Sequence, residues 1–499
     1  MATSYDAIVV GAGSAGCVVA GRLSAAGRRV LLVEAGGRPA LPAVADPPQW
    51  PGLSGGPLDW GYVTVPQPGL GGRAVPYPRG KGLGGSSLIN AMAYQAGNAA
   101  AYDRWPAGWR HADLLPYFRR AERFSGGGDE WRGDVGPLQV LSLADTETRS
   151  PLAAAFLEAA AQRGYPRSAD LGGAMRVGAA WNQLNIRRTE AGPQRHDTAS
   201  AWLDGLAGAS PDLLIDTPVL GLALEGTRCV GVRLPDRVVR CEGEVVLAAG
   251  AIDSPRLLML SGIGPASALD ALGIAVVVDL PEVGANLQDH VLLAGVVYDA
   301  PRPVPRSCYN HCDALLYVPA SDPADAPRHL VMGLSLPFAQ PALGPSPANG
   351  WTLVPCLLNP QSVGSVRLAS AEPQKPALID PAFLAEPADL ASLIEAVEIA
   401  RDLGAAPAFD PWRTREVHPG PAWSGRDART DFVRRALRPF HHPVGTCRID
   451  DVVDGELHVR GIEGLRVVDA SVMPGLPAAM IHAAVIAVAE KASALMIGI

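Results

Sequence analysis

Two neighbouring stretches decide the fold: Tyr5-Asp-Ala-Ile-Val-Val-Gly-Ala-Gly-Ser-Ala-Gly16 and Arg28-Arg-Val-Leu-Leu-Val-Glu-Ala-Gly36. An apolar run ends in a Gly-x-Gly-x-x-Gly turn, an alanine-rich stretch follows, and a second apolar run stops at an acid about 20 residues beyond the glycines. This order predicts a strand, a helix and a strand that bind a dinucleotide pyrophosphate at the helix N-terminus. The motif alone fits FAD and NAD equally well.

Each glycine of the turn has a separate role in this interpretation. Gly11 makes the tight turn, Gly13 lets the backbone approach the phosphates, and Gly16 lets the helix pack on the strand. The carboxylate of Glu34 can accept hydrogen bonds from an adenosine ribose and would repel a 2′-phosphate. We expect the neighbouring residues Ser14, Ala15 and Ala35 to belong to the same site.

Composition excludes several classes of protein. The chain has 499 residues, 48% of them hydrophobic, and a formal charge of −8 without a basic cluster, so we expect no nucleic-acid partner. Seven scattered cysteines fit a reducing compartment. The apolar stretch 478–488 is too short to span a membrane. No leader segment precedes the first strand, so we expect a soluble, cytoplasmic protein.

The pattern of elements along the chain changes after Glu34. Residues 38–78 are so rich in proline and glycine that we expect no regular element there, only a lid or an extended loop. Helices are predicted over 113–124, 151–163 and 389–403 and from about Ala478, and strands over 213–216, 230–234, 244–247, 291–298, 353–358, 365–368 and 465–468.

A second glycine-rich motif, Gly84-Gly-Ser-Ser87, precedes a predicted helix. It is either a turn with capping serines or a second set of backbone donors for phosphates or a planar ring. A third cluster, formed by Cys308, His311 and Cys312, has the residue types of a metal site. No second ligand pair lies nearby, so we interpret it as loop or core residues and predict no metal.

Several longer motifs resemble the glucose–methanol–choline (GMC) oxidoreductase family. Its two signatures are matched by Gly84-Gly-Ser-Ser87 and by Ser254-Pro255 with Ser261-Gly-Ile-Gly264. Further matches follow in the family's order at 283–290, 442–447, 468–474 and 489–491. The resemblance implies a mixed α/β and α+β fold. It combines a discontinuous Rossmann-type FAD-binding domain with a substrate domain of mixed antiparallel sheet and helices.

The same resemblance divides the chain into domains. We expect the FAD-binding domain to comprise residues 1–37, 79–120, 186–290 and 461–499. The lid would be 38–78, and the substrate-binding domain 121–185 and 291–460.

Two histidines near the C-terminus are the predicted catalytic pair. His441 and His442 are adjacent in a segment expected to be extended, so only one of them should enter the site. From the pattern alone, His442 could be a bonded core histidine. The family's His-Pro-x-Gly-Thr motif implies that it takes the substrate's hydroxyl proton. His482 holds the place of the family's second catalytic residue, near the start of a helix whose positive end should keep it neutral.

The resemblance also implies where FAD binds. A histidine that carries covalent flavin in some relatives is replaced by Ile89, so we expect non-covalent FAD. Asn90 to Ala93 should lie along the flavin, Val219 near the adenine, Asp469 at the ribityl chain and Ala483 at the ring. The complete predicted cofactor set is Gly11, Gly13, Ser14, Ala15, Gly16, Glu34, Ala35, Gly84, Ser87, Asn90, Ala91, Met92, Ala93, Val219, Ala249, Gly250, His441, Asp469, Ala470 and Ala483.

The predicted reaction is oxidation of a small-molecule alcohol to an aldehyde or ketone. It would be carried out by an alcohol oxidase or a choline dehydrogenase-like enzyme. The electron acceptor is oxygen or a quinone-type compound, and the sequence favours neither. The alternative is a flavin-containing lyase of the hydroxynitrile-lyase type, because cleavage of a cyanohydrin also begins with removal of a hydroxyl proton. The sequence leaves the alcohol and the oligomeric state open.

Overall fold

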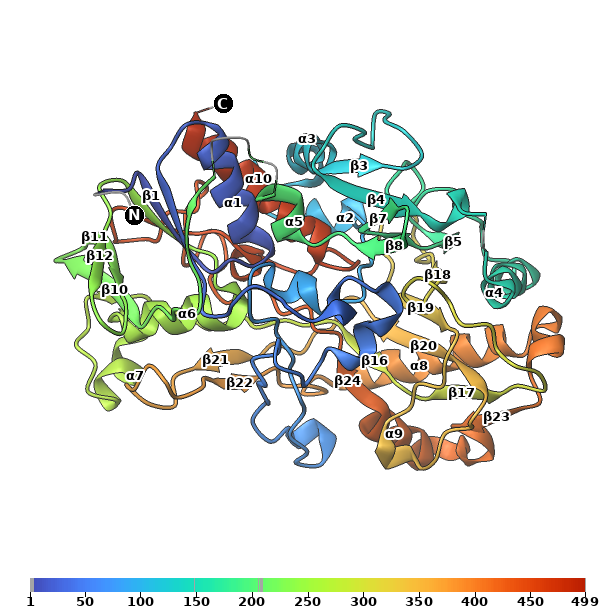
Figure 1. The fold of residues 1–499 in the computed structure, drawn as a ribbon. Coiled ribbons are helices and arrows are strands. Elements are labelled where there is room, and N and C mark those ends of the chain that lie inside the picture. Colours follow the sequence, from blue (N-terminus) through green and yellow to red (C-terminus); the bar gives the residue numbers. More distant parts are fainter. Residues whose placement is uncertain (1–3, 148, 205, 207–209, 499) are drawn as a thin grey trace.

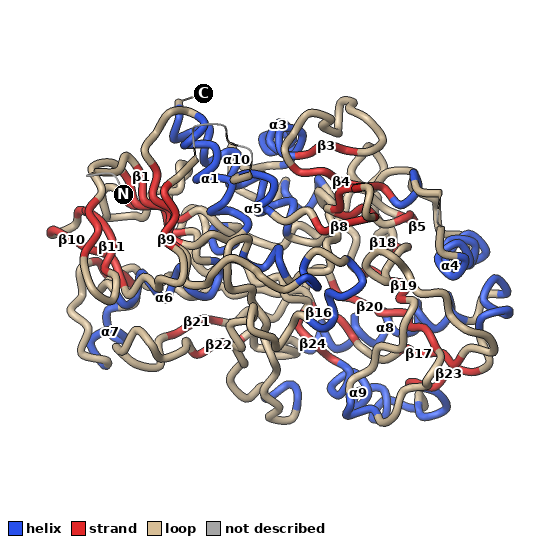
Figure 2. Tube along the Cα trace, viewed as in Figure 1, coloured by secondary structure: helices blue, strands red, loops and turns tan. Residues whose placement is uncertain are grey.

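Two sheets of different design build the protein, and they lie at opposite ends of the molecule (Figures 1 and 2). The structure is a computed structural model that describes residues 4–147, 149–204, 206 and 210–498. One sheet is parallel and contains strands from the start, the middle and the end of the chain. The other is antiparallel and is built mostly from the second half of the chain. This mixed α/β fold confirms the predicted fold class.

The parallel sheet has five strands in the order β25-β13-β1-β2-β9. Their bounds are β25 (Leu465–Val467), β13 (Glu244–Leu247), β1 (Ala7–Val10), β2 (Val30–Val33) and β9 (Asp212–Leu214). All four pairings are parallel. Every residue of β1 and β2 is buried, which is why both read as unbroken apolar runs in the sequence. The strand–helix–strand unit predicted from the glycine turn is confirmed.

Helices from both ends of the chain cover this sheet. Helix α1 (Ser14–Ala25) packs beside α10 (His482–Ile497), seen as blue and red ribbons in Figure 1. The fully buried carboxylate of Glu490 in α10 joins the surrounding helices. It accepts hydrogen bonds from Arg22 of α1 at 2.7 Å and from Trp202 of α5 (Thr198–Trp202) at 3.0 Å. It also pairs with Arg120 of α3 (His111–Ala121) at 3.2 Å.

The antiparallel sheet has eight strands. Six follow the order β23-β17-β20-β19-β18-β5, and β16 pairs with both β20 and β24. Helix α8 (Pro387–Gly404) packs against β20. The bounds are β23 (Arg415–His418), β17 (Val296–Asp299), β20 (Gly350–Leu357), β19 (His329–Leu334), β18 (Ala314–Tyr317), β5 (Gly178–Trp181), β16 (Val291–Leu293) and β24 (Leu437–Pro439).

Shorter elements complete the fold. The other helices are α2 (Ala99–Tyr102), α4 (Pro151–Gln162), α6 (Gly250–Leu260), α7 (Ala266–Ala271) and α9 (Gly425–Ala436), and the other strands are β3 (Glu122–Phe124), β4 (Leu138–Ser142), β6 (Gln183–Leu184), β7 (Ile186–Thr189), β8 (Gly192–Arg195), β10 (Gly221–Glu225), β11 (Arg228–Arg233), β12 (Val238–Arg240), β14 (Ile263–Gly264), β15 (Val278–Asp279), β21 (Ser365–Arg367) and β22 (Leu378–Asp380).

Several sequence expectations need correction. The single strand predicted over 291–298 is two strands, because Gly295 has φ +157° and a Cβ there would lie 2.5 Å from Leu343. The predicted helix after Gly84 is only a 3₁₀ turn, Gly85–Leu88. The last helix begins at His482 and not at Ala478. Segment 38–78 contains three 3₁₀ turns that each open with a proline: Pro42–Val44, Pro47–Gly52 and Pro68–Leu70.

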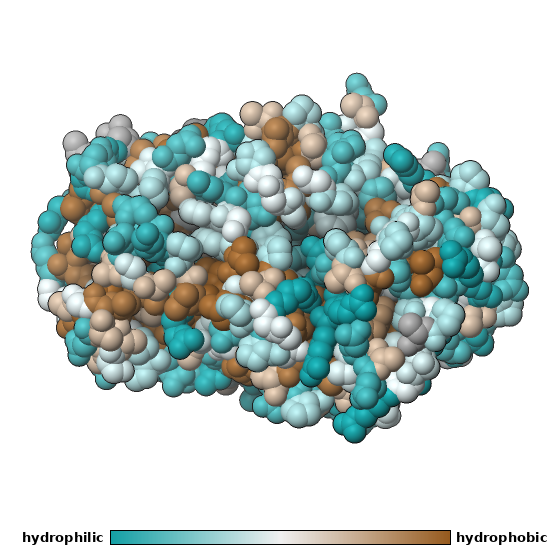
Figure 3. Space-filling view, turned by 90° about the horizontal axis from the view of Figure 1, so that it is seen from below, coloured by the Kyte–Doolittle hydropathy of each residue, from teal (hydrophilic) through white to brown (hydrophobic). Residues whose placement is uncertain are grey.

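The surface mixes polar and apolar side chains. On the face seen from below, hydrophobic residues gather in a band across the middle, with polar residues around it (Figure 3). Within the described part of the chain, no helix combines the length and the apolar character needed to cross a membrane.

Candidate active site

One large cavity brings the predicted site residues together. Its volume is about 1160 Å³, more than the ~300–1,000 Å³ that one drug-sized ligand takes. At one end it is lined by Gly11, Gly13 and Glu34, which we call the glycine-turn end. At the other it is lined by His442 and His482, which we call the histidine end. Its size suits a dinucleotide with a small substrate beside it.

The three glycines of the turn differ in what surrounds them. A Cβ on Gly16 would lie 1.8 Å from the Gly11 carbonyl oxygen, and one on Gly11 would lie 2.7 Å from the Ala248 oxygen. A Cβ on Gly13 would meet nothing within 4 Å, and Gly13 lines the cavity. The same is true of Gly250, at the start of α6. These two open glycines leave bare backbone facing the cavity, a cradle that fits the phosphates of FAD.

Two buried carboxylates hold the walls of this cradle. Glu34 accepts hydrogen bonds from the backbone N–H groups of Ala12, Gly36 and Gly82 at 2.8, 2.8 and 3.1 Å. Burial raises its pKa, and these three donors oppose that rise. A carboxylate has about four acceptor positions, so one remains for a ribose hydroxyl.

Asp469 has the same design beside α6. It accepts hydrogen bonds from Gly250 N at 2.8 Å, Ser254 Oγ at 2.5 Å and Ser471 N at 2.8 Å. Burial again raises the pKa of the carboxyl, and the hydrogen bonds counteract this. Asp469 lines the cavity, so its remaining acceptor position is open to a polar ligand.

The middle of the cavity is lined by the segment from Asn90 to Ala93. The buried guanidinium of Arg195 holds this segment by donating to Asn90 Oδ1 at 2.7 Å. Met92 adopts a left-handed φ of 59° there. Most of the predicted cofactor set lines the cavity, but four members do not: Gly16, Gly84, Ser87 and Ala483.

Those four residues lie behind the cavity wall. Gly84 donates its backbone N–H to Ala12 O at 2.8 Å, which fixes the second glycine motif against the first. The Ser87 hydroxyl donates to Gly84 O at 2.6 Å and lies 2.9 Å from the Thr198 hydroxyl. Ala483 is the buried second residue of α10. Of the two interpretations of the serines, the contacts favour stabilisation of the turn.

His442 follows strand β24 at the histidine end. Its backbone N–H donates to Asp289 Oδ1 at 2.7 Å, and the imidazole stacks on Phe440 with ring centroids 4.4 Å apart. Burial lowers its pKa well below the usual range, and the neighbouring His290, His441 and Arg79 lower it further. The ring is therefore neutral, as a general base must be.

His290 touches the ring of His442. The two Nδ1 atoms are 3.0 Å apart, so one ring donates and the other accepts. His290 is fully buried, and burial lowers its pKa to about 3. A hydrogen bond between two neutral rings therefore couples their tautomers: the donor carries its proton on Nδ1, and the acceptor carries its proton on Nε2. His442 Nε2 makes no hydrogen bond with any described residue.

His482 is the first residue of α10, and its ring meets Tyr94 edge-on with centroids 6.1 Å apart. Neither ring nitrogen has a hydrogen-bond partner among the described residues, although the side chain is buried and lines the cavity. Burial lowers its pKa to about 4, with a smaller contribution from Arg195. Two unpartnered nitrogens facing a cavity are suited to a bound ligand.

The expectation that only one of the adjacent histidines enters the site is wrong. Both His441 and His442 line the cavity. His441 has a left-handed φ of 66°, so the alternation of an extended strand does not continue through it. Its carbonyl accepts a hydrogen bond from Arg79 at 2.6 Å.

Sequence reasoning missed four residues around the histidines: Arg79, Asp289, His290 and Arg438. Asp289 and His290 stand inside a recognised motif, so their position was a usable signal. Asp289 joins Tyr77, which donates to it at 2.6 Å, to the backbone of His442. The sequence around Arg438 contains no comparable motif, because the role of this residue depends on which face of the sheet it occupies.

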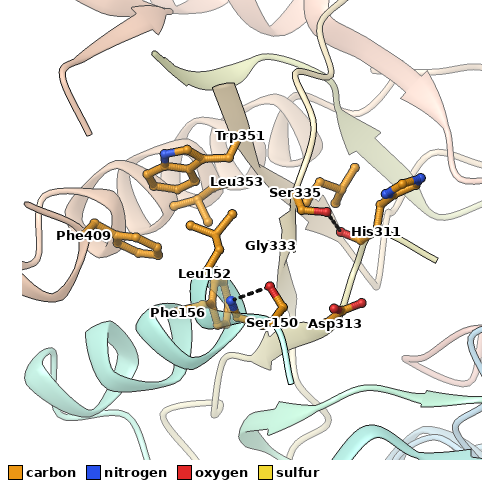
Figure 4. A pocket seen from close by; sticks show the side chains of 12 residues that line it. Ser150, Leu152, Phe156, His311, Asp313, Gly333, Ser335, Trp351, Leu353 and Phe409 are labelled. Carbon is orange, nitrogen blue, oxygen red and sulfur yellow. Dashed lines mark hydrogen bonds between the residues drawn. The ribbon is translucent and has the colours of Figure 1, made fainter. Parts of the chain in front are cut away.

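A second cavity, of about 10 Å³, lies between α4 and strands β19 and β20 (Figure 4). Phe156, Trp351 and Phe409 line one side, and His311 and Asp313 line the other. It has room for about one water molecule, so it is no substrate site. Among the described residues, no group of three or more His, Cys, Asp or Glu side chains could hold a metal ion.

Known proteins with this architecture share its full length. The chain is 38% identical over 505 residues to pyridoxine 4-oxidase of Microbacterium luteolum, covering 98% of both chains. It is 33% identical to an oxygen-dependent choline dehydrogenase of Brucella anthropi, covering 99% of this chain and 95% of the relative. The crystal structure of pyridoxine 4-oxidase from Mesorbium loti superposes with a TM-score of 0.93 at 38% identity, covering 99% of each chain.

Two models of one protein family match most of the chain. Both are described as GMC oxidoreductase, and they match residues 5–292 and 360–489. The earlier resemblance is thereby confirmed, and the open glycine cradle fits the cofactor of this family. The chain belongs to the GMC oxidoreductase family and is an FAD-dependent oxidoreductase.

Proposed function

We propose that the protein oxidises an alcohol to an aldehyde or ketone, with His442 as the base that takes the hydroxyl proton. The observation that carries this proposal is the state of His442. It is a neutral imidazole with an unbonded Nε2, in a cavity that continues to the glycine turn. A flavin bound there would supply the acceptor for the hydride from the alcohol carbon, while His442 takes the hydroxyl proton.

His290 positions the proton that His442 does not use. For His442 Nε2 to accept the substrate's proton, its own proton must sit on Nδ1 and point to His290 Nδ1, 3.0 Å away. His290 then carries its proton on Nε2, which makes no hydrogen bond with any described residue. His290 therefore acts as a neutral orienter of the base, in the place where other enzymes use a carboxylate.

His482 is the partner of the base in this proposal. Its unbonded nitrogens can accept from or donate to the substrate oxygen, depending on which one carries the proton. Because its pKa is about 4, it stays neutral at physiological pH, and it orients the hydroxyl without competing with His442 for the proton.

The cofactor residues and domain boundaries predicted above are part of the same proposal. Glu34 would hold the ribose and Asp469 the ribityl chain. FAD would bind non-covalently beside Ile89, so acid precipitation should leave all the flavin in the supernatant. The division into an FAD-binding domain, a lid and a substrate-binding domain is supported by the separation of the two sheets (Figure 1).

The names of the relatives support an aromatic alcohol as the substrate and oxygen as the electron acceptor. A relative that matches over nearly the full length is named for the oxidation of pyridoxine, a ring that bears a hydroxymethyl group. Cavity-lining residues at the histidine end include Phe338, Phe440 and Met480, apolar surfaces that fit a ring. We infer an aromatic primary alcohol as the substrate. The names "oxidase" and "oxygen-dependent" favour oxygen as the acceptor over a quinone.

Anaerobic mixing of the purified holoenzyme with aromatic alcohols tests the proposal. Bleaching of the yellow flavin is the expected result, and aeration should restore the colour and release peroxide. Reoxidation by an artificial quinone but not by air would reassign the acceptor. Release of an aldehyde and cyanide from an aromatic cyanohydrin, without bleaching, would replace oxidation by the lyase reaction.

A further inference from the structure

The cavity is lined by a cation, Arg438, that pairs with no acid among the described residues. Arg438 is the middle residue of β24 and lines the cavity. No hydrogen bond or ion pair joins its guanidinium to any described residue, and its one specific contact is with the face of Phe338, 5.4 Å away. Burial lowers its pKa, and so does the neighbouring Arg73, which is itself a cation.

The sheet places Arg438 on the face that forms the substrate end of the cavity. Arg438 lies opposite Leu292 of β16, and Leu292 lies opposite Cys356 of β20. Residues directly opposite each other, or two apart in a strand, share a face, so this face also contains Val354. Leu292 and Val354 line the cavity with Arg438, and both belong to the same apolar cluster.

Arg438 is also close in sequence to the proposed base. Phe440 follows it by two residues and packs against the same apolar cluster. Phe440 stacks on the imidazole of His442. Arg438, Phe440 and His442 thus line the same cavity, and Phe440 stands between the cation and the proposed base in the chain.

A partly buried cation without an anion is costly, and its neighbours here are apolar or positive. A planar guanidinium pairs best with a carboxylate or a phosphate, which it can grip with two parallel hydrogen bonds. We propose that Arg438 selects aromatic alcohols whose ring carries both the reacting hydroxymethyl group and an oxyanion, either a carboxylate or a phosphate. The same charge repels cationic alcohols such as choline. This inference rests on the proposed alcohol oxidation and names its substrate class.

The test compares ring alcohols of similar shape and different charge. 4-(Hydroxymethyl)benzoate and 4-(hydroxymethyl)phenyl phosphate carry an oxyanion, benzyl alcohol is neutral, and 4-(aminomethyl)benzyl alcohol is cationic. With the wild-type holoenzyme, kcat/KM for flavin reduction should be at least tenfold higher for an oxyanion than for benzyl alcohol. The better of the two oxyanions separates carboxylate from phosphate. The cationic alcohol and choline should be the poorest substrates.

Variants assign this preference to Arg438. Arg438→Met should lower the ratio of kcat/KM for the oxyanion to kcat/KM for benzyl alcohol about 10- to 100-fold. Arg438→Lys should restore part of the loss, and Arg438→Glu should turn the preference toward the cationic alcohol. The matched control is Arg434→Met, which removes the same charge from an exposed position on α9 outside the cavity. It should leave all ratios unchanged.

A binding measurement separates this inference from the proposed oxidation. Benzoate and benzamide have no hydroxyl to oxidise, and their binding is read from the shift of the flavin absorbance. Wild type should bind benzoate at least tenfold more tightly than benzamide, and Arg438→Met should bind both alike. Equal ratios in wild type and Arg438→Met would overturn the role of Arg438, even if alcohols bleach the flavin. Selective benzoate binding without any bleaching would overturn the oxidation and keep the oxyanion site.

Discussion

The glycine-turn end and the histidine end of the cavity are built in opposite ways. The first presents bare backbone at Gly13 and Gly250, held by the carboxylates of Glu34 and Asp469, which accept backbone N–H bonds. The second is made of side chains that come from distant segments: His290 lies beside His442, and His482 lines the same cavity. The first end is therefore sensitive to added side-chain atoms, and the second is sensitive to the loss of functional groups.

The largest effect should come from adding one methyl group at the glycine turn. Gly16→Ala places a Cβ 1.8 Å from the Gly11 carbonyl oxygen, so strand and helix must separate. We expect little soluble yellow protein and a lower melting temperature. Gly13→Ala is the matched control, because its Cβ meets no protein atom within 4 Å. It should fold normally but contain less FAD. Full FAD content in Gly13→Ala would show that the phosphates do not pass there.

Replacing the proposed base at the histidine end should leave the fold intact and slow the reaction. His442→Ala should retain its FAD and its melting temperature but reduce flavin about 10² to 10⁴ times more slowly, because the base is gone. Stopped-flow absorbance under anaerobic conditions measures this rate. A rate within threefold of wild type would rule out His442 as the base.

A smaller effect is expected from the residue behind the base. His290→Phe keeps a ring in the buried space but removes the Nδ1 partner, so flavin reduction should slow by about tenfold, the value of one hydrogen bond. His290→Gln can still offer an acceptor oxygen and should recover part of the rate. Equal rates in the two variants would mean that His290 only fills space.

The smallest effect should be a displacement of the acidic limb of the pH profile. A base must be unprotonated, and the pKa of His442 is lowered well below its usual value by burial and by nearby cations. The rate of flavin reduction should therefore stay constant as the pH falls through about 6.5, the pKa of an unperturbed histidine. It should decline only at lower pH. A limb at or above 6.5 would contradict the neutral, buried environment.

The same contrast explains what could be predicted from the sequence. The turn from Gly11 to Glu34 is local, so spacing alone predicted β1, α1 and β2. Strands β13 and β25 were predicted because strands buried on both faces read as apolar runs. Arg438 could not be assigned a role, because its chemistry arises only when β24 pairs with β16.

Local backbone conformation caused the remaining errors. The division of residues 291–298 at Gly295 could have been suspected, since a glycine inside a strand pattern often marks a break. The left-handed conformation of His441 had no such signal, and it brings a second histidine to the cavity.

The position of β25 in the parallel sheet has a consequence for synthesis of the protein. This strand, Leu465–Val467, covers the edge of β13. Strand β13 begins at Glu244, which is 221 residues before Leu465 in the chain. Until the ribosome has made β25, β13 leaves unpaired backbone groups at the edge of a very apolar sheet. Chains that stop before this strand therefore expose a template for aggregation, and the sheet that carries the glycine turn is completed only after Val467 has been made.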